Sequence, residues 1–129
     1  MKNVASAESR KESAVQFLQL VVSGNVDQAY KNFVMMNGKH HNPFFSAGLP
    51  SLKKAMSDNN VQSPSKKLTV KNVLADGNLV AIHSHLVMQP GEKGMIVVHI
   101  FRFDGDKIVE IWECGQQIPA DSPNTDGAF

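Results

Sequence analysis

The sequence has little cysteine, little net charge and no long apolar run. Cys114 is the only cysteine among 129 residues, so an internal disulfide is impossible and no cysteine pair suggests a zinc site. The 13 lysine and arginine residues nearly balance the 12 acidic residues, which disfavours nucleic acid and anionic membranes as partners. No run of about 18 apolar residues could span a bilayer, and the first residues, MKNVASAESRKES, lack the apolar segment of a secretory signal. We therefore expect a cytoplasmic protein with neither a nucleic-acid partner nor a membrane partner.

The first half of the sequence has the period of amphipathic helices. Within SRKESAVQFLQLVVSG the apolar residues recur at i, i+3, i+4 and i+7, and Ser9 and Glu12 have the spacing of a capping box. A second helix is predicted from Asn25, and a third in LPSLKKAMSDNN, where Pro50 is tolerated in the first turn. The stretch between them, MNGKHHNPFFSAG, is predicted to be irregular.

The second half has the period of strands. Four runs rich in β-branched and aromatic residues are separated by short turns that contain glycine: SKKLTVKNVLA, NLVAIHSHLVM, KGMIVVHIFRF and KIVEIWECGQQI. Short turns make neighbouring strands antiparallel. No linker or repeat divides the chain, so residues 1–129 are predicted to form a single α+β domain, a curved antiparallel sheet wrapped round three N-terminal helices.

Four side chains on the predicted strands could carry chemistry. His83 and His85 lie two residues apart, so they share one face of their strand; His99 lies on the next strand and Glu113 on the last. If all four face inward, three strands bring imidazoles and one carboxyl group into an apolar pocket. Burial there would raise the pKa of Glu113 toward the range useful for proton transfer. The competing interpretations are ordinary cross-strand hydrogen bonds for the histidines and a solvated strand-edge position for the glutamate.

The same histidines also raise the question of a metal site. Gly77, five further residues and His83-Ser84-His85 have the opening spacing of the cupin metal motif. The glutamate expected soon afterwards and the second half of that motif are absent, and N-terminal helices are foreign to a jelly roll. No metal is therefore predicted, and His83, His85 and His99 are the ligands to test for the alternative.

Several segments together resemble the SnoaL-like polyketide cyclases of the nuclear-transport-factor-two-like superfamily. They are HHNPFFSAG, LVAIHSHLV, IVVHIFRFDGDKIVEIWECGQQIP and NTDGAF, and the resemblance covers nearly the whole chain. It implies a cone-shaped α+β barrel with an internal pocket, paired as a homodimer through the outer sheet face. It also implies that the acid after tryptophan, here Glu113, is the general acid and base of an aldol ring closure that needs no metal or cofactor. His41, in the loop before Asn42-Pro43, is brought into the site by the same resemblance.

These observations predict a cofactor-independent acid/base enzyme, namely an aldol-type cyclase, lyase or isomerase that acts on a small apolar carbonyl compound. Glu113 would move a proton next to the carbonyl, and His83, His85, His99 and His41 complete the predicted catalytic set. The predicted substrate-binding side chains are Phe17, Tyr30, Phe33, Phe45, Phe101 and Ile111. The alternative is a non-catalytic small-ligand binding or dimerisation module, because this kind of scaffold supports many functions.

Overall fold

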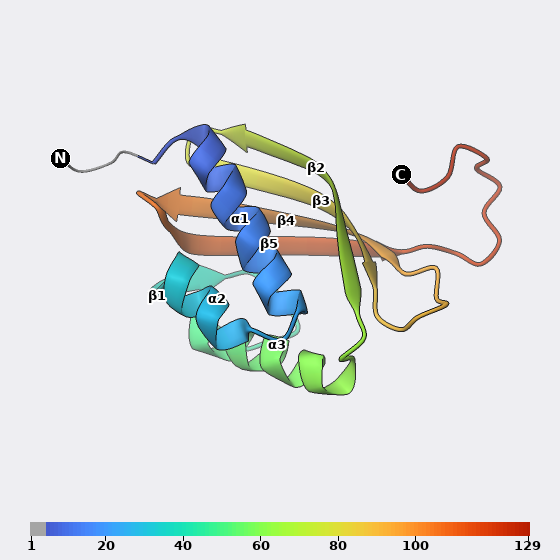
Figure 1. The fold of residues 1–129 in the computed structure, drawn as a ribbon, viewed down its shortest axis with the longest axis horizontal. Helices are drawn as coiled ribbons and strands as arrows, with labels where there is room; N and C mark the ends of the chain where they lie inside the picture. Colours follow the sequence, from blue (N-terminus) through green and yellow to red (C-terminus); the bar gives the residue numbers. More distant parts are fainter. Residues whose placement is uncertain (1–4) are drawn as a thin grey trace.

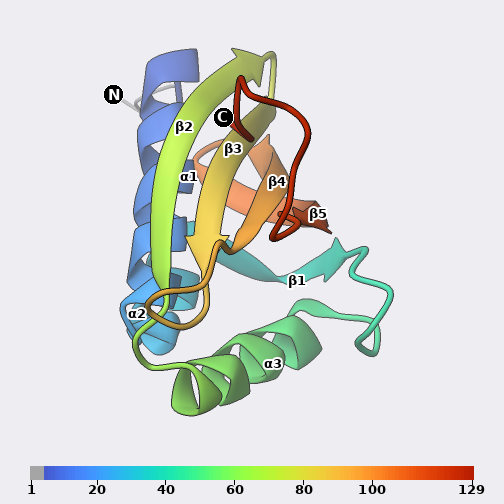
Figure 2. The same cartoon turned by 90° about the vertical axis from the view of Figure 1, so that its right-hand side faces the viewer.

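Three helices and a five-stranded sheet make up the protein in a computed structural model that describes residues 5–129. The elements in chain order are α1 (Ala7–Val22), α2 (Val26–Phe33), β1 (Val34–His40), α3 (Leu49–Gln62), β2 (Lys67–Asp76), β3 (Leu79–Val87), β4 (Met95–Asp104) and β5 (Lys107–Gln117). The strands are ordered β1-β5-β4-β3-β2 in one open, curved sheet. Helix α1 crosses one face of this sheet, and α3 lies across its lower end (Figures 1 and 2). The predicted α+β class and the three N-terminal helices are confirmed.

The N-cap of α1 lies three residues earlier than predicted. Ser6, not Ser9, is the N-cap: its side chain accepts the Ser9 N–H, and the Ser9 hydroxyl oxygen accepts the Ser6 N–H in return. The predicted apolar stripe is buried as expected. At the other end Gly24 has a φ of 90°, which closes the helix through the Asn25 N–H to the Leu20 carbonyl at 2.8 Å.

Strand β1 is the element that the sequence did not reveal. It occupies part of the stretch predicted to be irregular and pairs in parallel with β5, so the sheet is antiparallel only from β5 to β2. Gly38 lies where the two strands come closest, because a Cβ placed there would lie 2.2 Å from the carbonyl oxygen of Val109. The absence of a side chain at this position therefore allows β1 to pair with β5. The strand ends at His40, which is buried.

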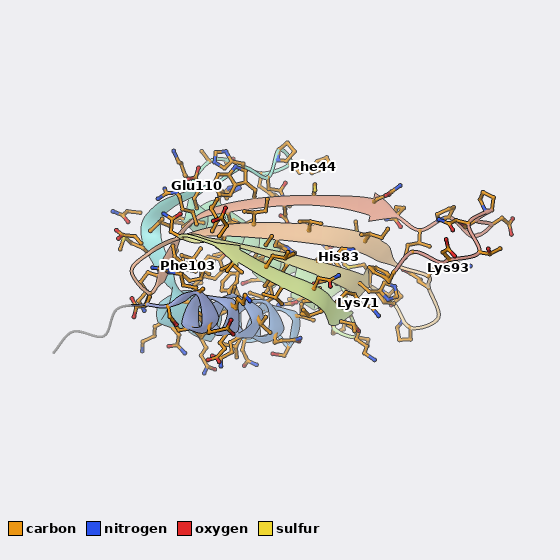
Figure 3. All side chains as sticks on the ribbon, turned by 90° about the horizontal axis from the view of Figure 1, so that it is seen from above. Phe44, Lys71, His83, Lys93, Phe103 and Glu110 are labelled. Atoms are coloured by element: carbon orange, nitrogen blue, oxygen red, sulfur yellow. The ribbon has the colours of Figure 1, made fainter. Side chains whose placement is uncertain are left out.

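The strand register divides the sheet into two faces. Ile82, His99 and Glu113 lie side by side on one face, and His83, Val98 and Cys114 lie side by side on the other. The first set faces α1 and is called the inner face; the second is called the outer face. Figure 3 shows this division at two labelled residues, with Phe103 between the sheet and α1 and Glu110 on the opposite side.

A bulge in β5 changes one predicted orientation. The register slips between the pairs Arg102–Glu110 and Phe103–Ile108, so an extra residue, Val109, opposes no partner in β4. Strict alternation along the strand would place Ile108 on the face of Glu110 and Trp112, but the bulge returns it to the inner face, where it is fully buried.

The core is built where α1 and α2 meet the inner face. The Phe17 ring contacts Tyr30 and Phe101 edge to face, with ring centroids 5.3 and 5.7 Å apart, and all three side chains are almost completely buried.

Within residues 5–129, none of the helices combines the length and the apolar character required to cross a bilayer.

Candidate functional site

A carboxylate and an imidazole form a pair at the centre of the inner face. Glu113 of β5 and His99 of β4 are direct neighbours in the register, and His99 Nε2 lies 3.1 Å from Glu113 Oε2. The Glu113 side chain is 24 % exposed and retains limited access to solvent, whereas the His99 side chain is 9 % exposed and enclosed. The His99 ring lies parallel to that of Phe101 with the centroids 5.9 Å apart, which fixes the imidazole plane. The other ring nitrogen, Nδ1, is buried and has no hydrogen-bond partner within residues 5–129.

The loop after β1 holds the second oxygen of Glu113. Asn42 donates a side-chain N–H to Glu113 Oε1, and its own side-chain oxygen accepts the Phe44 N–H at 2.9 Å, so the amide can point only one way. The Asn42 backbone N–H donates to His40 Nδ1 at 3.1 Å, which leaves His40 to donate from Nε2 to the Ser46 carbonyl at 2.7 Å. The loop that contains His40-His41-Asn42-Pro43 thus holds the Asn42 amide against the carboxylate.

Hydrogen bonds outweigh burial in setting the charge of Glu113. Burial raises the pKa of this carboxyl group, but the hydrogen bond and charge of His99 and the hydrogen bond of the Asn42 amide lower it by more, so the net pKa lies below the ordinary value of 4.5. The predicted increase is therefore wrong, because the sequence showed the apolar walls but not the donors. At neutral pH Glu113 is an ionised carboxylate that can accept a proton.

A buried hydroxyl group lies near the pair. Burial, and secondarily the negative charge of Glu113, raise the pKa of Tyr30, so its phenol keeps its proton. That proton is donated to the Met56 thioether at 3.1 Å, and sulfur is a weak acceptor. Tyr30, predicted as a substrate-binding residue, thus contributes a hydroxyl group whose present partner is easily replaced.

The pair opens into a mainly apolar cavity of about 280 Å³ between α1, α3 and the inner face. His99 and Glu113 form part of its wall, and Phe45 closes it from the loop after β1. Three methionines, which adapt to irregular ligands, line it as well: Met56, Met88 and Met95. The remaining polar lining consists of Asn59 and Lys66. A cavity of this size, apolar with a few convergent polar groups, is typical of a small-molecule site.

Two of the predicted catalytic histidines lie on the wrong face for this cavity. His83 and His85 pair with Val98 and Ile96, which places them on the outer face, opposite to His99 and Glu113. There the two rings contact Phe129, with centroids 5.3 and 4.9 Å away. The predicted convergence of all four side chains is therefore wrong, and the three histidines considered as metal ligands cannot share one ion. Within residues 5–129, no group of three or more histidine, cysteine or acidic side chains is arranged to hold a metal.

His41 also belongs to the outer face. Its ring stacks on Trp112 at 5.2 Å between centroids, and its Nε2 lies 2.6 Å from Glu110 Oε2. Arg102 donates to the other oxygen of Glu110 at 2.8 Å. The residue that faces the site is instead His40, one position earlier. Because β1 was not predicted, no alternation of side chains was available to choose between the two histidines.

The predicted substrate-binding residues divide into core and cavity. Phe17, Tyr30, Phe101 and Ile111 are buried in the core and do not line the cavity, and Phe33 is partly buried and packs against that core from the end of α2. Of the six predicted side chains, only Phe45 lines the cavity itself. Sequence reasoning missed Asn42, His40 and Lys66; the first two lie in the quoted HHNPFF segment, whereas nothing in the sequence singled out Lys66.

A larger cavity lies away from the pair. It measures about 980 Å³ and is lined by residues at the ends of β4 and β5 and by the C-terminal tail, residues 118–128. This tail leaves β5 and returns over the sheet toward β3 (Figure 2), where Phe129 contacts His83 and His85. Its lining is as polar as it is apolar and contains neither a histidine nor Glu113. Size alone therefore does not identify the functional site, and the smaller cavity contains the only hydrogen-bonded acid and imidazole pair on the inner face in residues 5–129.

Comparison with known proteins supports the fold. No family model and no curated protein sequence matches the chain. A SnoaL-like protein of unknown function from Burkholderia thailandensis superimposes with a TM-score of 0.72 at 14 % identity, over 87 % of this chain and 98 % of that one. A proposed polyketide cyclase from Acidithiobacillus ferrooxidans gives 0.67 at 19 % identity, over 88 % and 91 %. AclR, a proposed hydroxylase from Streptomyces galilaeus, gives 0.73 at 19 % identity, over 86 % and 91 %.

The chain thus has the fold shared by proteins described as cystatin-fold, NTF2-like and SnoaL-like. This is the fold that the sequence resemblance implied. At these identities the likeness concerns architecture, and one architecture carries many chemistries.

Proposed function

We propose that the protein is a cofactor-independent acid/base enzyme, an aldol-type cyclase, lyase or isomerase, that acts on a small apolar carbonyl compound. One observation carries the proposal: the carboxylate of Glu113 is held by His99 and Asn42 at the wall of a mainly apolar cavity. An ionised, oriented carboxylate that an apolar ligand can reach is the arrangement that proton abstraction next to a carbonyl requires.

The reaction begins with proton transfer to Glu113. The carboxylate takes a proton from the carbon next to the carbonyl, and the electron pair of that C–H bond moves to the carbonyl oxygen as an enolate. The enolate carbon then attacks a second carbonyl in the same molecule, or takes a proton back at another carbon. Glu113 returns its proton in either case, so the enzyme ends as it began.

Two neighbours of Glu113 have supporting roles in this scheme. His99 and Asn42 engage one carboxylate oxygen each, so they orient Glu113 and keep it ionised between turnovers. The Tyr30 hydroxyl lies behind the cavity wall and donates to the sulfur of Met56, which lines the cavity; with Met56 displaced by the ligand, this hydroxyl is the proposed hydrogen-bond donor to the enolate oxygen. It takes the place of His83 and His85, which the strand register puts on the outer face, and of His41, which stacks on Trp112 there.

Deuterium exchange tests the proposal without knowledge of the natural substrate. A panel of small ketones and 1,3-dicarbonyl compounds is incubated with the protein in D₂O, and loss of the α-proton signal is followed by NMR. The wild-type protein is expected to accelerate exchange of some members, and Glu113→Gln to lose at least about 100-fold of that rate, as for removal of a general base. Glu92→Gln, in an exposed turn, is the matched control and should retain the full rate. Equal rates for wild type and Glu113→Gln would exclude this mechanism.

A non-catalytic ligand-binding module is the second candidate. It is favoured by the fact that both oxygens of Glu113 already have hydrogen-bond partners, as expected of a carboxylate with a structural role. The module would bind apolar carbonyl compounds and exchange none of their protons. Binding by wild type and Glu113→Gln with equal affinity, without exchange by either, is the result that selects this alternative.

The outer face is proposed to pair two copies of the chain. Val98, Ile100 and Trp112 lie together there and are only partly buried, so an apolar surface remains for a partner. Light scattering after size-exclusion chromatography is expected to give the mass of a dimer. A monomer at micromolar concentration contradicts this pairing but leaves the chemistry of the inner face untouched.

A further inference from the structure

The cavity has a second polar end. Asn59, in the last turns of α3, and Lys66, just before β2, line it together with the Glu113 pair. Strands β3 and β4 lie between β2 and β5 in the sheet. Three strand spacings of about 4.8 Å, about 14 Å across the sheet, therefore separate β2 from β5, and Glu113 lies four residues along β5 from Gln117, the residue in register with Leu68.

Lys66 lacks the carboxylate partner that nearby lysines have. Lys53 lies 2.9 Å from Asp27 and Lys54 lies 2.8 Å from Asp58, whereas no carboxylate of residues 5–129 lies within 4 Å of the Lys66 ammonium group. Lys66 donates one hydrogen bond to the side-chain oxygen of Asn59, which leaves up to two of its three donors for another acceptor. Burial lowers the pKa of Lys66, as expected for a cation whose charge nothing nearby neutralises.

The surface between the two ends is apolar. Leu68, Leu86 and Met95 lie side by side on β2, β3 and β4 in the strand register, and all three line the cavity. A ligand that spans the cavity therefore meets a cation and an amide at one end, apolar side chains in the middle, and an anionic carboxylate at the other end.

We infer that the ligand is an amphipathic acid whose carboxylate binds Lys66 and Asn59 while its carbonyl end reaches Glu113. Opposite charges at the two ends give the ligand one orientation: an anionic group is attracted to Lys66 and repelled from Glu113, so the neutral carbonyl is the end presented for proton transfer. The assignment of the carbonyl end rests on the proposed function, whereas the anion subsite at Lys66 stands on its own contacts. The substrate class that follows is a keto acid with an apolar segment between its two oxygen functions.

Isothermal titration calorimetry with octanoate and octanamide tests the anion subsite at pH 7. These probes share a chain and differ in charge. The wild-type protein is expected to bind octanoate at least about tenfold more tightly than octanamide, equivalent to about 1.4 kcal/mol. Lys66→Met should abolish that preference, because it keeps the length of the side chain and removes the charge. Lys66→Arg should retain it, and Lys67→Met, an exposed neighbour, is the matched control that should leave it unchanged.

The outcomes separate this inference from the proposed function. No binding of octanoate, equal affinities of wild type for the two probes, or a preference that survives Lys66→Met would overturn the anion subsite even if Glu113-dependent exchange is found. A preference that depends on Lys66 in a protein that exchanges no carbonyl proton would support the subsite and reject the enzyme. Glu113→Gln should not reduce the octanoate preference, because the substitution removes a negative charge that repels the anion.

Discussion

Replacement of Asn42 by alanine should raise the pKa of Glu113 by about one unit. The asparagine amide donates to one oxygen of the ionised carboxylate, so its loss disfavours the charged form. A hydrogen bond to a charged group contributes about 1.5–3 kcal/mol, and one pKa unit corresponds to about 1.36 kcal/mol. Water can replace part of this bond because the Glu113 side chain is about one-quarter exposed, which places the expected shift at the lower end of that range.

The assay is the pH dependence of kcat/KM for α-proton exchange, together with a ¹³C NMR titration of the Glu113 carboxyl group. The wild-type rate should fall in acid with a midpoint below 4.5, the ordinary pKa of a glutamate side chain. This midpoint should move to higher pH in Asn42→Ala. Asn72→Ala is the control, because Asn72 bonds to His83 on the outer face and should leave the midpoint in place. An unchanged or lower midpoint in a folded Asn42→Ala protein would refute the assigned role of the loop.

Three further changes test the fold and its electrostatics. The hydrogen bond from His41, and secondarily that from Arg102, lowers the pKa of Glu110. These contacts therefore stabilise the protein fully above about pH 4.5 and less as the pH falls. Glu110→Gln should lower Tm at pH 7 but not in strong acid, and a loss of Tm that is independent of pH would contradict this. Phe17→Ala should cost about 3–5 kcal/mol in urea unfolding, whereas Phe44→Ala, 86 % exposed, should cost under about 0.5 kcal/mol; similar costs would refute the assigned core. Gly38→Ala should lower Tm and also raise the pKa of Glu113, since the added methyl group pushes β1 and its loop away from β5; a loss of Tm without that pKa change would uncouple the strand from the site.

The fold could be predicted because its elements carry local signals. The stripe from Ala14 to Val21 has helical period, and the four later runs alternate between turns that contain glycine, so helix and strand positions follow from side-chain periodicity alone. Strand β1 has no such signal. Its sequence, VMMNGKH, does not alternate, and it is a strand because Gly38 lets it lie against β5, which only the assembled sheet reveals.

The site could be predicted only in part, because it depends on register between strands. Alternation places His83 and His85 together, and Glu113 with Ile111, but the relation of one strand to the next depends on the β3–β4 connection. That connection pairs His83 with Val98, so the odd-numbered His99 faces the other way; a slip of one residue would have reversed this. Glu113 and His99 were predicted and lie together, whereas the donors that set the charge of Glu113 come from a loop whose geometry has no sequence period.

Chemical rescue of Glu113→Ala tests whether the Glu113 carboxylate carries the proton. Truncation removes the carboxylate and leaves space for a small acid beside His99 and Asn42. Exchange of the α-protons of an accepted carbonyl compound should be lost in this variant and restored, with saturation, by added formate or acetate, while Glu113→Gln, which fills the space, should not respond. Full exchange by Glu113→Ala without added acid, or equal stimulation of both variants, would show that the carboxylate at this position does not carry the proton.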